Sequence, residues 1–123
     1  MSKKILLVDD EKLARKSLAN VLENPGLLVE QAANGKEGYE KALEWQPDLI
    51  VTDVHMPEMD GMQMIQKLRD HEAWGSKVPI VVLTVDEAPV YINQALEAGV
   101  TFYLSKNSIS QEEIAEQIVI AAG

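Results

Sequence analysis

Acidic side chains directly follow two apolar segments of this sequence. Asp9 and Asp10 come after the run Lys-Ile-Leu-Leu-Val, and Asp53 comes after Leu-Ile-Val-Thr. A carboxylate is costly to bury without a partner, so each of these segments should end at a crevice or a surface. Three carboxylates that met in one crevice would repel each other. A hard divalent cation such as Mg²⁺, which prefers oxygen ligands, would offset that repulsion.

A hydroxyl and an ammonium follow the same pattern, because Thr84 and Lys106 also stand at the ends of apolar segments. Three aspartates give a formal charge of about −3, and Mg²⁺ with Lys106 gives about +3, so the set would be roughly neutral. Such a site would attract a phosphoryl group, which an aspartate can accept as an acyl phosphate. The sequence has no glycine-rich phosphate loop, so a bound nucleotide is not indicated.

Short apolar runs alternate with segments of helical periodicity along the whole chain. Val21 and Leu96 are among the residues expected to face inward, and Ser110 with Glu113 forms a capping box that starts the last helix. The predicted strands cover residues 4–8, 27–32, 48–53, 79–84 and 101–104, and the predicted helices cover 11–24, 36–45, 61–70, 89–99 and the segment after Ser110.

This alternation predicts an α/β fold with a parallel sheet and helices on both faces. For five such units we expect a flavodoxin-like three-layer (βα)5 sandwich with the strand order 2-1-3-4-5. In these sheets the ligand crevice lies outside the carboxyl ends of the strands, here between the first and third. The four strand ends that carry Asp9-Asp10, Asp53, Thr84 and Lys106 would therefore converge at one edge.

Composition sets limits on the function. The length of 123 residues suits one domain, and the net charge of −9 argues against direct binding to a nucleic-acid backbone. No apolar run approaches the ~20 residues that a membrane span needs. The sequence has no cysteine, which excludes disulfides and thiolate metal sites, and a cytoplasmic location fits that composition.

The motifs together resemble a response-regulator receiver domain, the CheY-like fold of two-component signalling. The resemblance covers the chain as one receiver domain, residues 1–123, and depends on four segments: "ILLVDDE", "DVHMPEMDG", the "LT" that ends the fourth strand, and "AGVTFYLSK". It implies a phosphorylated signalling domain rather than an enzyme with a substrate of its own.

The resemblance also implies roles for the acidic residues. Asp53 matches the residue that accepts the phosphoryl group, and Mg²⁺ is the implied cofactor. Asp10 matches a direct Mg²⁺ ligand, and Asp9 matches a ligand that acts through water. The backbone carbonyl of His55 would complete the protein's share of the metal ligands.

Further roles fall on the other side of the crevice. Lys106 and Thr84 would bind phosphoryl oxygens, and Thr84 with Tyr103 would form a switch in which the hydroxyl moves to the phosphate and the ring turns inward. The switch would change the face formed by the helix over 89–99, the strand after it and the last helix. The implied partners are a sensor histidine kinase or phosphotransfer protein as donor, and a target protein, a covalently linked output domain or a second copy as receiver of the signal.

Two positions depart from the family pattern. Receivers usually have proline after the lysine, where this chain has Asn107, and a very small residue after the threonine, where it has Val85. A cis bond before a residue other than proline costs ~2.5–4 kcal/mol. We therefore expect a trans Lys106–Asn107 bond, with the flexible lysine side chain still reaching Asp53.

Two other functions fit parts of the sequence: an interaction module that works without phosphorylation, and a small metal-dependent phosphatase with an aspartate nucleophile. The phosphatase is disfavoured because such enzymes have a second aspartate two residues after the first, where this chain has His55. Simpler structural explanations suit several other residues. Asp60-Gly61 is typical of a turn or cap, His55 and His71 of the surface, and Trp45 and Trp74 of the edges of an apolar core.

Overall fold

The computed structural model describes residues 2–71 and 73–123. Strands and helices alternate through these residues as the sequence predicts, except that two helices follow each other before the fourth strand. In chain order they are β1 (Lys3–Val8), α1 (Lys12–Leu22), β2 (Leu27–Ala32), α2 (Gly35–Trp45), β3 (Leu49–Thr52), α3 (Gly61–Asp70), α4 (Trp74–Lys77), β4 (Ile80–Thr84), α5 (Pro89–Glu97), β5 (Phe102–Ser105) and α6 (Gln111–Ala122).

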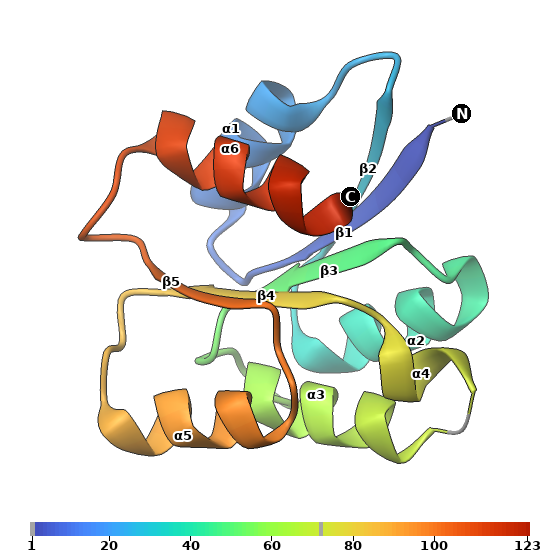
Figure 1. The fold of residues 1–123 in the computed structure, drawn as a ribbon, viewed down its shortest axis with the longest axis vertical. Coiled ribbons are helices and arrows are strands. Elements are labelled where there is room, and N and C mark those ends of the chain that lie inside the picture. Colours follow the sequence, from blue (N-terminus) through green and yellow to red (C-terminus); the bar gives the residue numbers. More distant parts are fainter. Residues whose placement is uncertain (1, 72) are drawn as a thin grey trace.

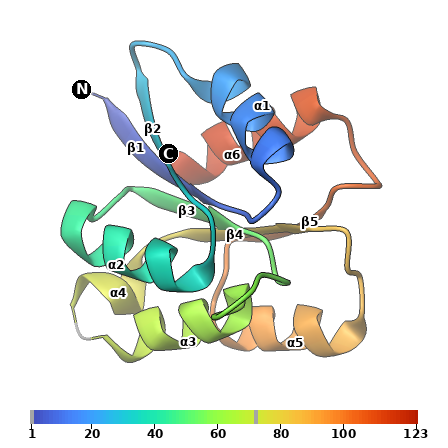
Figure 2. The same ribbon diagram turned by 180° about the vertical axis from the view of Figure 1, so that it is seen from behind.

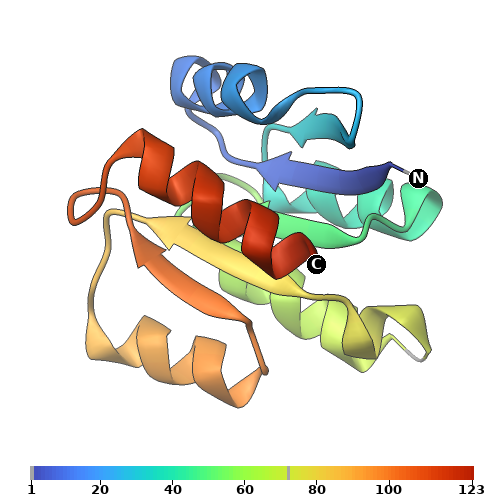
Figure 3. The same ribbon diagram turned by 45° about the horizontal axis from the view of Figure 1, so that its top comes forward.

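The five strands form one parallel sheet in the order β2-β1-β3-β4-β5, which confirms the predicted fold. In the register of the sheet, Val8 at the end of β1 lies opposite Thr52 at the end of β3, and Thr84 of β4 lies opposite Ser105 of β5. The arrowheads of the strands therefore point to one side of the molecule (Figure 3). The loops that leave the strands meet at that edge.

Helices cover both faces of the sheet in three layers. Helices α1 and α6 lie on one face, and α2, α3 and α5 lie on the other (Figures 1 and 2). The residues of β1 pack alternately on the two faces. Ile5 and Leu7 belong to the apolar cluster under α1 and α6, whereas Leu6 and Val8 belong to the cluster under the other helices. A strand that is buried on both faces needs a continuous apolar run, and parallel sheets favour such runs.

Side-chain caps fix the start of three helices. The Ser110 hydroxyl accepts a hydrogen bond from the Glu113 backbone N–H at 3.1 Å, which confirms the predicted capping box. Asp60 caps α3 in the same way by accepting from the Gln63 N–H at 2.8 Å, in agreement with the cap expected at Asp60-Gly61. Asn34 caps α2. Such caps satisfy N–H groups that the first turn of a helix leaves unpaired.

Three features of the fold differ from the predictions. The short helix α4 was not predicted. Val21 and Leu96 were expected to face inward, but the structure leaves them 50% and 64% exposed. Helix α1 contacts the sheet through Leu18 and Leu22 instead, and α5 through Ala95. In both helices the buried stripe is narrower than the apolar pattern.

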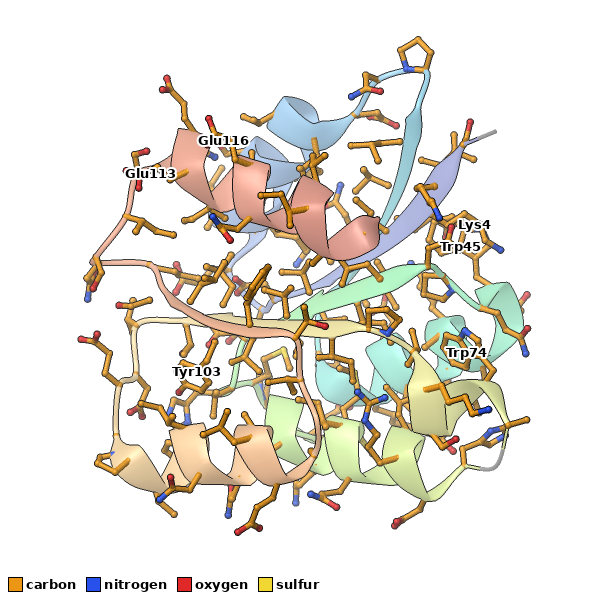
Figure 4. The ribbon with its side chains drawn as sticks, viewed as in Figure 1. Lys4, Trp45, Trp74, Tyr103, Glu113 and Glu116 are labelled. Atoms are coloured by element: carbon orange, nitrogen blue, oxygen red, sulfur yellow. The ribbon has the colours of Figure 1, made fainter. Side chains whose placement is uncertain are left out.

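The histidines and tryptophans lie where the sequence analysis expected them. His55 and His71 are exposed. Trp45 and Trp74 are half-buried and pack against the edge of the core at the end of the molecule opposite Tyr103 (Figure 4). None of the helices formed by the described residues is long and apolar enough to cross a membrane.

Candidate functional site

The acidic site forms where β1 and β3 end side by side. The Asp53 N–H donates a hydrogen bond to the Val8 carbonyl at 3.0 Å, so the chain keeps the sheet pairing as far as this aspartate. The Asp53 side chain is then held in place because its Oδ1 accepts from the Val54 N–H at 2.6 Å. Asp53 is only 7% exposed, although it carries a carboxylate. This burial is costly unless positive charge lies nearby.

Three carboxylates meet in this crevice. Oxygens of Asp9, Glu11 and Asp53 lie within 4.8 Å of one another, a grouping that could hold a metal ion. Asp10, which was expected to be a ligand, is exposed and is not one of this group, whereas Glu11, which is also exposed, is. Directly after β1, the Glu11 N–H donates a hydrogen bond of 2.9 Å to Asp9 Oδ1.

Lys106 supplies the positive charge from the loop after β5. Its Nζ lies 2.7 Å from Asp9 Oδ2 and 3.2 Å from Asp53 Oδ2, and its side chain is only 18% exposed. Burial lowers the pKa of Lys106, but the hydrogen bond to Asp9 and the charges of Asp53 and Asp9 outweigh it, so that the pKa is raised overall. The Lys106–Asn107 bond is trans, like every other peptide bond that the structure describes. Both expectations for this segment are thus confirmed.

The raised pKa of Lys106 predicts how this ion pair contributes to stability. Lys106→Gln leaves Asp9 and Asp53 without the ammonium, and we expect it to lower the free energy of unfolding at neutral pH by about 1–2 kcal/mol. A raised pKa means that this contribution is complete below the ordinary lysine value of 10.5 and is lost as the pH rises through the folded-state value. Urea unfolding of the unsubstituted chain and of Lys106→Gln checks this prediction. The difference in stability should be present at neutral pH and should shrink as the pH rises above 10.5.

Lys36→Gln serves as the control because Lys36 is exposed. It should shift the urea midpoint little at either pH. If Lys106→Gln behaved like Lys36→Gln at neutral pH, the contacts of Lys106 with the two carboxylates would contribute nothing measurable.

Thr84 and Tyr103 lie on the β4 and β5 side of the crevice. The buried Thr84 hydroxyl accepts a hydrogen bond from the Asp86 N–H at 3.2 Å. The Tyr103 hydroxyl donates to the Asp86 carbonyl at 2.6 Å, and the ring lies between β5 and α5 (Figure 4). Burial, with the charge of Asp86 as a further cause, raises the pKa of Tyr103 to about 12. The described contacts include no hydrogen bond between Thr84 and Asp53.

Glu11 and Asp86 are not among the residues predicted from the sequence to form the site. Both residues are two positions after a predicted site residue, Asp9 and Thr84 respectively, and each backbone N–H bonds to the side chain of that residue. Turns of this kind are common for Asp and Thr, so the spacing alone marks a local turn and says nothing of a ligand.

The cavity at the carboxylates is small. Asp9, Asp53 and Lys106 are among the residues that line a space of about 40 Å³. Pockets for organic ligands usually measure roughly 300–1,000 Å³, so this space fits an ion and a few waters, not a metabolite. Carboxylates that face an ammonium in such a space can hold a hard cation and receive an anionic group.

Several known proteins resemble this chain. Protein-glutamate methylesterase/protein-glutamine glutaminase 2 of Carboxydothermus hydrogenoformans is 39% identical over an alignment of 128 positions that covers 97% of this chain and 35% of that protein. The transcriptional regulatory protein SrrA of Staphylococcus aureus is 38% identical over 106 residues, 86% of this chain and 42% of the relative. This chain therefore spans well under half the length of these curated relatives.

Solved structures of other proteins also resemble this chain. The chemotaxis response regulator CheY4 of Vibrio cholerae is 29% identical with a TM-score of 0.86, and the match covers 98% of this chain and 99% of that one. A CheY-like response regulator receiver domain protein of Methanospirillum hungatei is 25% identical with a TM-score of 0.89, over 99% of this chain and 94% of that one. Residues 5–119 match the family model for the response regulator receiver domain, and the chain therefore belongs to that family.

Proposed function

We propose that this chain is the phosphoacceptor switch of a two-component system, in which Asp53 takes a phosphoryl group from a phosphohistidine on a sensor histidine kinase or phosphotransfer protein. The observation that carries the proposal is the buried Asp53 carboxylate, 3.2 Å from the Lys106 ammonium in a crevice that also holds Asp9 and Glu11. Three carboxylates exceed what one ammonium neutralises. The excess negative charge favours a cation in the same place.

The proposed transfer is a substitution at phosphorus. An Asp53 oxygen forms a new P–O bond while the P–N bond to the donor imidazole breaks, and the electron pair returns to the ring nitrogen, which takes up a proton. Lys106 would hold a phosphoryl oxygen, since its Nζ already lies beside Asp53. Bound Mg²⁺ would supply further positive charge to the phosphoryl oxygens. The chain would catalyse only its own phosphorylation and dephosphorylation.

The metal would be held by Asp53, by Asp10, by the backbone carbonyl of His55 and, through water, by Asp9. The donor set fits Mg²⁺, which binds few protein oxygens and retains several waters. Asp10 would have to turn toward Asp53, whereas Glu11, although also exposed, already lies in the acidic group. The two neighbouring acids are thus a matched pair for a test.

We expect the chain to gain one phosphoryl group from acetyl phosphate with Mg²⁺ and none when a chelator removes the metal. Asp10→Asn should slow the reaction at least roughly tenfold if Asp10 is a ligand, because loss of a carboxylate ligand weakens a site with few protein ligands. Glu11→Gln should slow it only a few-fold. Intact-mass spectrometry over time measures both rates.

If Glu11→Gln slowed phosphorylation more than Asp10→Asn did, the metal ligand would be Glu11 and not Asp10. Phosphorylation that proceeds at full rate in chelator would contradict the metal-dependent mechanism. Thermal melts of each variant without metal serve as the folding control, and Asp10→Asn should melt no lower than the unsubstituted chain because it removes a negative charge next to the acidic group.

The phosphorylated state would act through Thr84 and Tyr103. Both residues border the face formed by α5, β5 and α6, which would bind a target protein, a linked output domain or a second copy. A phosphoryl group can shift the protein toward one state only if its interactions differ between the two states. We propose that the Thr84 hydroxyl donates a hydrogen bond to a phosphoryl oxygen, and that this bond favours the phosphorylated state of the switch.

The proposed function also includes the extent of the domain, its location in the cell and its partners. The receiver domain would extend over residues 1–123 and act in the cytoplasm, where a kinase would supply the phosphoryl group. Direct contact with nucleic acid is not part of the proposal, since the net charge is −9. The curated relatives are longer than this chain, and this supports a linked output domain as one route for the signal.

A further inference from the structure

Asp86 is the centre of a group of contacts beside the proposed site. It lies in the loop between β4 and α5, and its Oδ2 is 2.6 Å from Nε2 of His55 in the loop after β3. Its Oδ1 accepts a hydrogen bond from the Ala88 N–H at 2.8 Å. The bond with His55, followed by the bond from Ala88, lowers the pKa of the Asp86 carboxyl. The side chain thus joins two loops that are far apart in sequence.

The backbone of the same residue holds both members of the proposed switch. The Asp86 N–H donates to the Thr84 hydroxyl at 3.2 Å, and the Asp86 carbonyl accepts from the Tyr103 hydroxyl at 2.6 Å. Tyr103 packs against the core cluster under α3 and α5, so its ring is turned inward. The position of the Asp86 backbone therefore determines whether the Tyr103 hydroxyl has an acceptor when the ring is inside.

A second contact holds the His55 ring in place. It meets the Tyr91 ring of α5 edge to face, with centroids 5.1 Å apart and planes at 90°. His55 is 54% and Asp86 26% exposed at the side chain, so water alone could satisfy both groups. Their pairing is not required to satisfy buried polar groups. Its structural consequence is that the loops after β3 and β4 are fixed relative to each other.

We infer that the His55–Asp86 pair is a clasp that positions the Asp86 carbonyl to receive the inward Tyr103 hydroxyl, so that the inward ring is favoured before phosphorylation. Asp86 and His55 are positioning residues in this account, since neither is assigned contact with the phosphoryl group through its side chain. The clasp deepens the proposed function and depends on it, because the inward ring matters for signalling only if Tyr103 belongs to the switch.

The test compares His55→Phe, which keeps a ring beside Tyr91 but has no donor for Asp86, with Asp86→Asn, the double variant and Glu87→Gln, which makes the same charge change as Asp86→Asn at the next residue. Asp86→Asn keeps an oxygen for the Ala88 N–H, so the local turn is preserved. In protein with isotope-labelled tyrosine rings and no phosphoryl group, NMR follows the Tyr103 signal, which is identified by its loss in Tyr103→Phe.

We expect the Tyr103 ring signal to move toward that of a solvent-exposed tyrosine in both single variants and to stay in place in Glu87→Gln. Binding of beryllofluoride with Mg²⁺ should weaken by roughly three- to tenfold in each single variant, because the inward ring loses support. The double variant should show no more than the larger single effect, since both changes break one contact.

Unchanged Tyr103 signals in both single variants, or additive effects in the double variant, would overturn the clasp. The ring signal needs no phosphoryl group, so it tests the clasp even if the proposed function is wrong. Conversely, failure of the unsubstituted chain to bind beryllofluoride would contradict the proposed function and leave the ring signals as the measure of the clasp.

Discussion

Asp53→Ala should gain no mass when it is incubated with acetyl phosphate and Mg²⁺, under conditions in which the unsubstituted chain gains one phosphoryl group. Asp53 is 7% exposed and its carboxylate faces Lys106 at 3.2 Å, whereas Asp9 is bonded to that same ammonium at 2.7 Å. A nucleophile must be aligned with the phosphorus, and in the proposed function the crevice gives that alignment to Asp53, the residue directly after β3.

The matched control is Asp70→Ala, which removes an exposed carboxylate at the end of α3. It should be phosphorylated at the rate of the unsubstituted chain. Circular dichroism and a thermal melt establish that Asp53→Ala is folded, which we expect because it removes one of three repelling carboxylates. A phosphoryl group that still appears on Asp53→Ala would move the acceptor to another residue, and peptide mapping would identify it.

Most of the fold follows from the sequence because its signals are local and repeated. Each strand is a short apolar run followed by a turn residue, and each long helix has an apolar stripe or a cap such as Ser110 with Glu113. Parallel strands with right-handed crossovers then leave few topologies. Helix α4 has four residues and offers no periodic pattern, so its formation depends on tertiary contacts.

The exposed positions of Val21 and Leu96 show a limit of helical periodicity. An apolar stripe predicts which side of a helix faces the protein, but the width of the contact depends on the angle and distance at which the helix lies on the sheet. Helix α1 contacts the sheet chiefly through Leu18, Ala19 and Leu22. The sequence carries no local signal for that angle.

The sequence predicts which site residues stand at the ends of strands, but it does not predict how their side chains are arranged. The positions of Asp9, Asp53 and Lys106 at one edge follow from the topology alone, and their distances agree with it. Asp10 and Glu11 are both exposed, and the sequence does not specify which of their carboxylates lies near Asp9 and Asp53, because that depends on the conformation of the chain directly after β1. The contact between His55 and Asp86 likewise joins two loops whose relative position only the folded sheet determines.

Gly61→Ala should cause the largest loss of stability among single-methyl changes near the site. Gly61 begins α3, and its N–H donates to the Val54 carbonyl at 2.7 Å, so the helix start lies directly on the loop that leaves β3. A Cβ at this position would overlap the backbone carbonyl of Asp53 and lie 3.2 Å from the Thr52 hydroxyl oxygen. A backbone carbonyl cannot rotate aside as a flexible side chain can, so either α3 or the end of β3 has to move.

We expect this change to lower the free energy of unfolding by about 2–3 kcal/mol, the upper part of the range for overpacking, and the melting temperature by roughly 10 °C. It should also slow phosphorylation by acetyl phosphate several-fold, because the displaced backbone is that of Asp53, the proposed acceptor. The control is Gly26→Ala, where the added methyl meets the Asn24 side-chain oxygen at 3.2 Å and no backbone atom within 4 Å. Thermal melts and phosphorylation rates of Gly61→Ala and Gly26→Ala test this prediction. If Gly61→Ala melted as high as Gly26→Ala, the close approach of α3 to Asp53 would not exist in solution, and the account of how the fold holds Asp53 at the crevice would need another support.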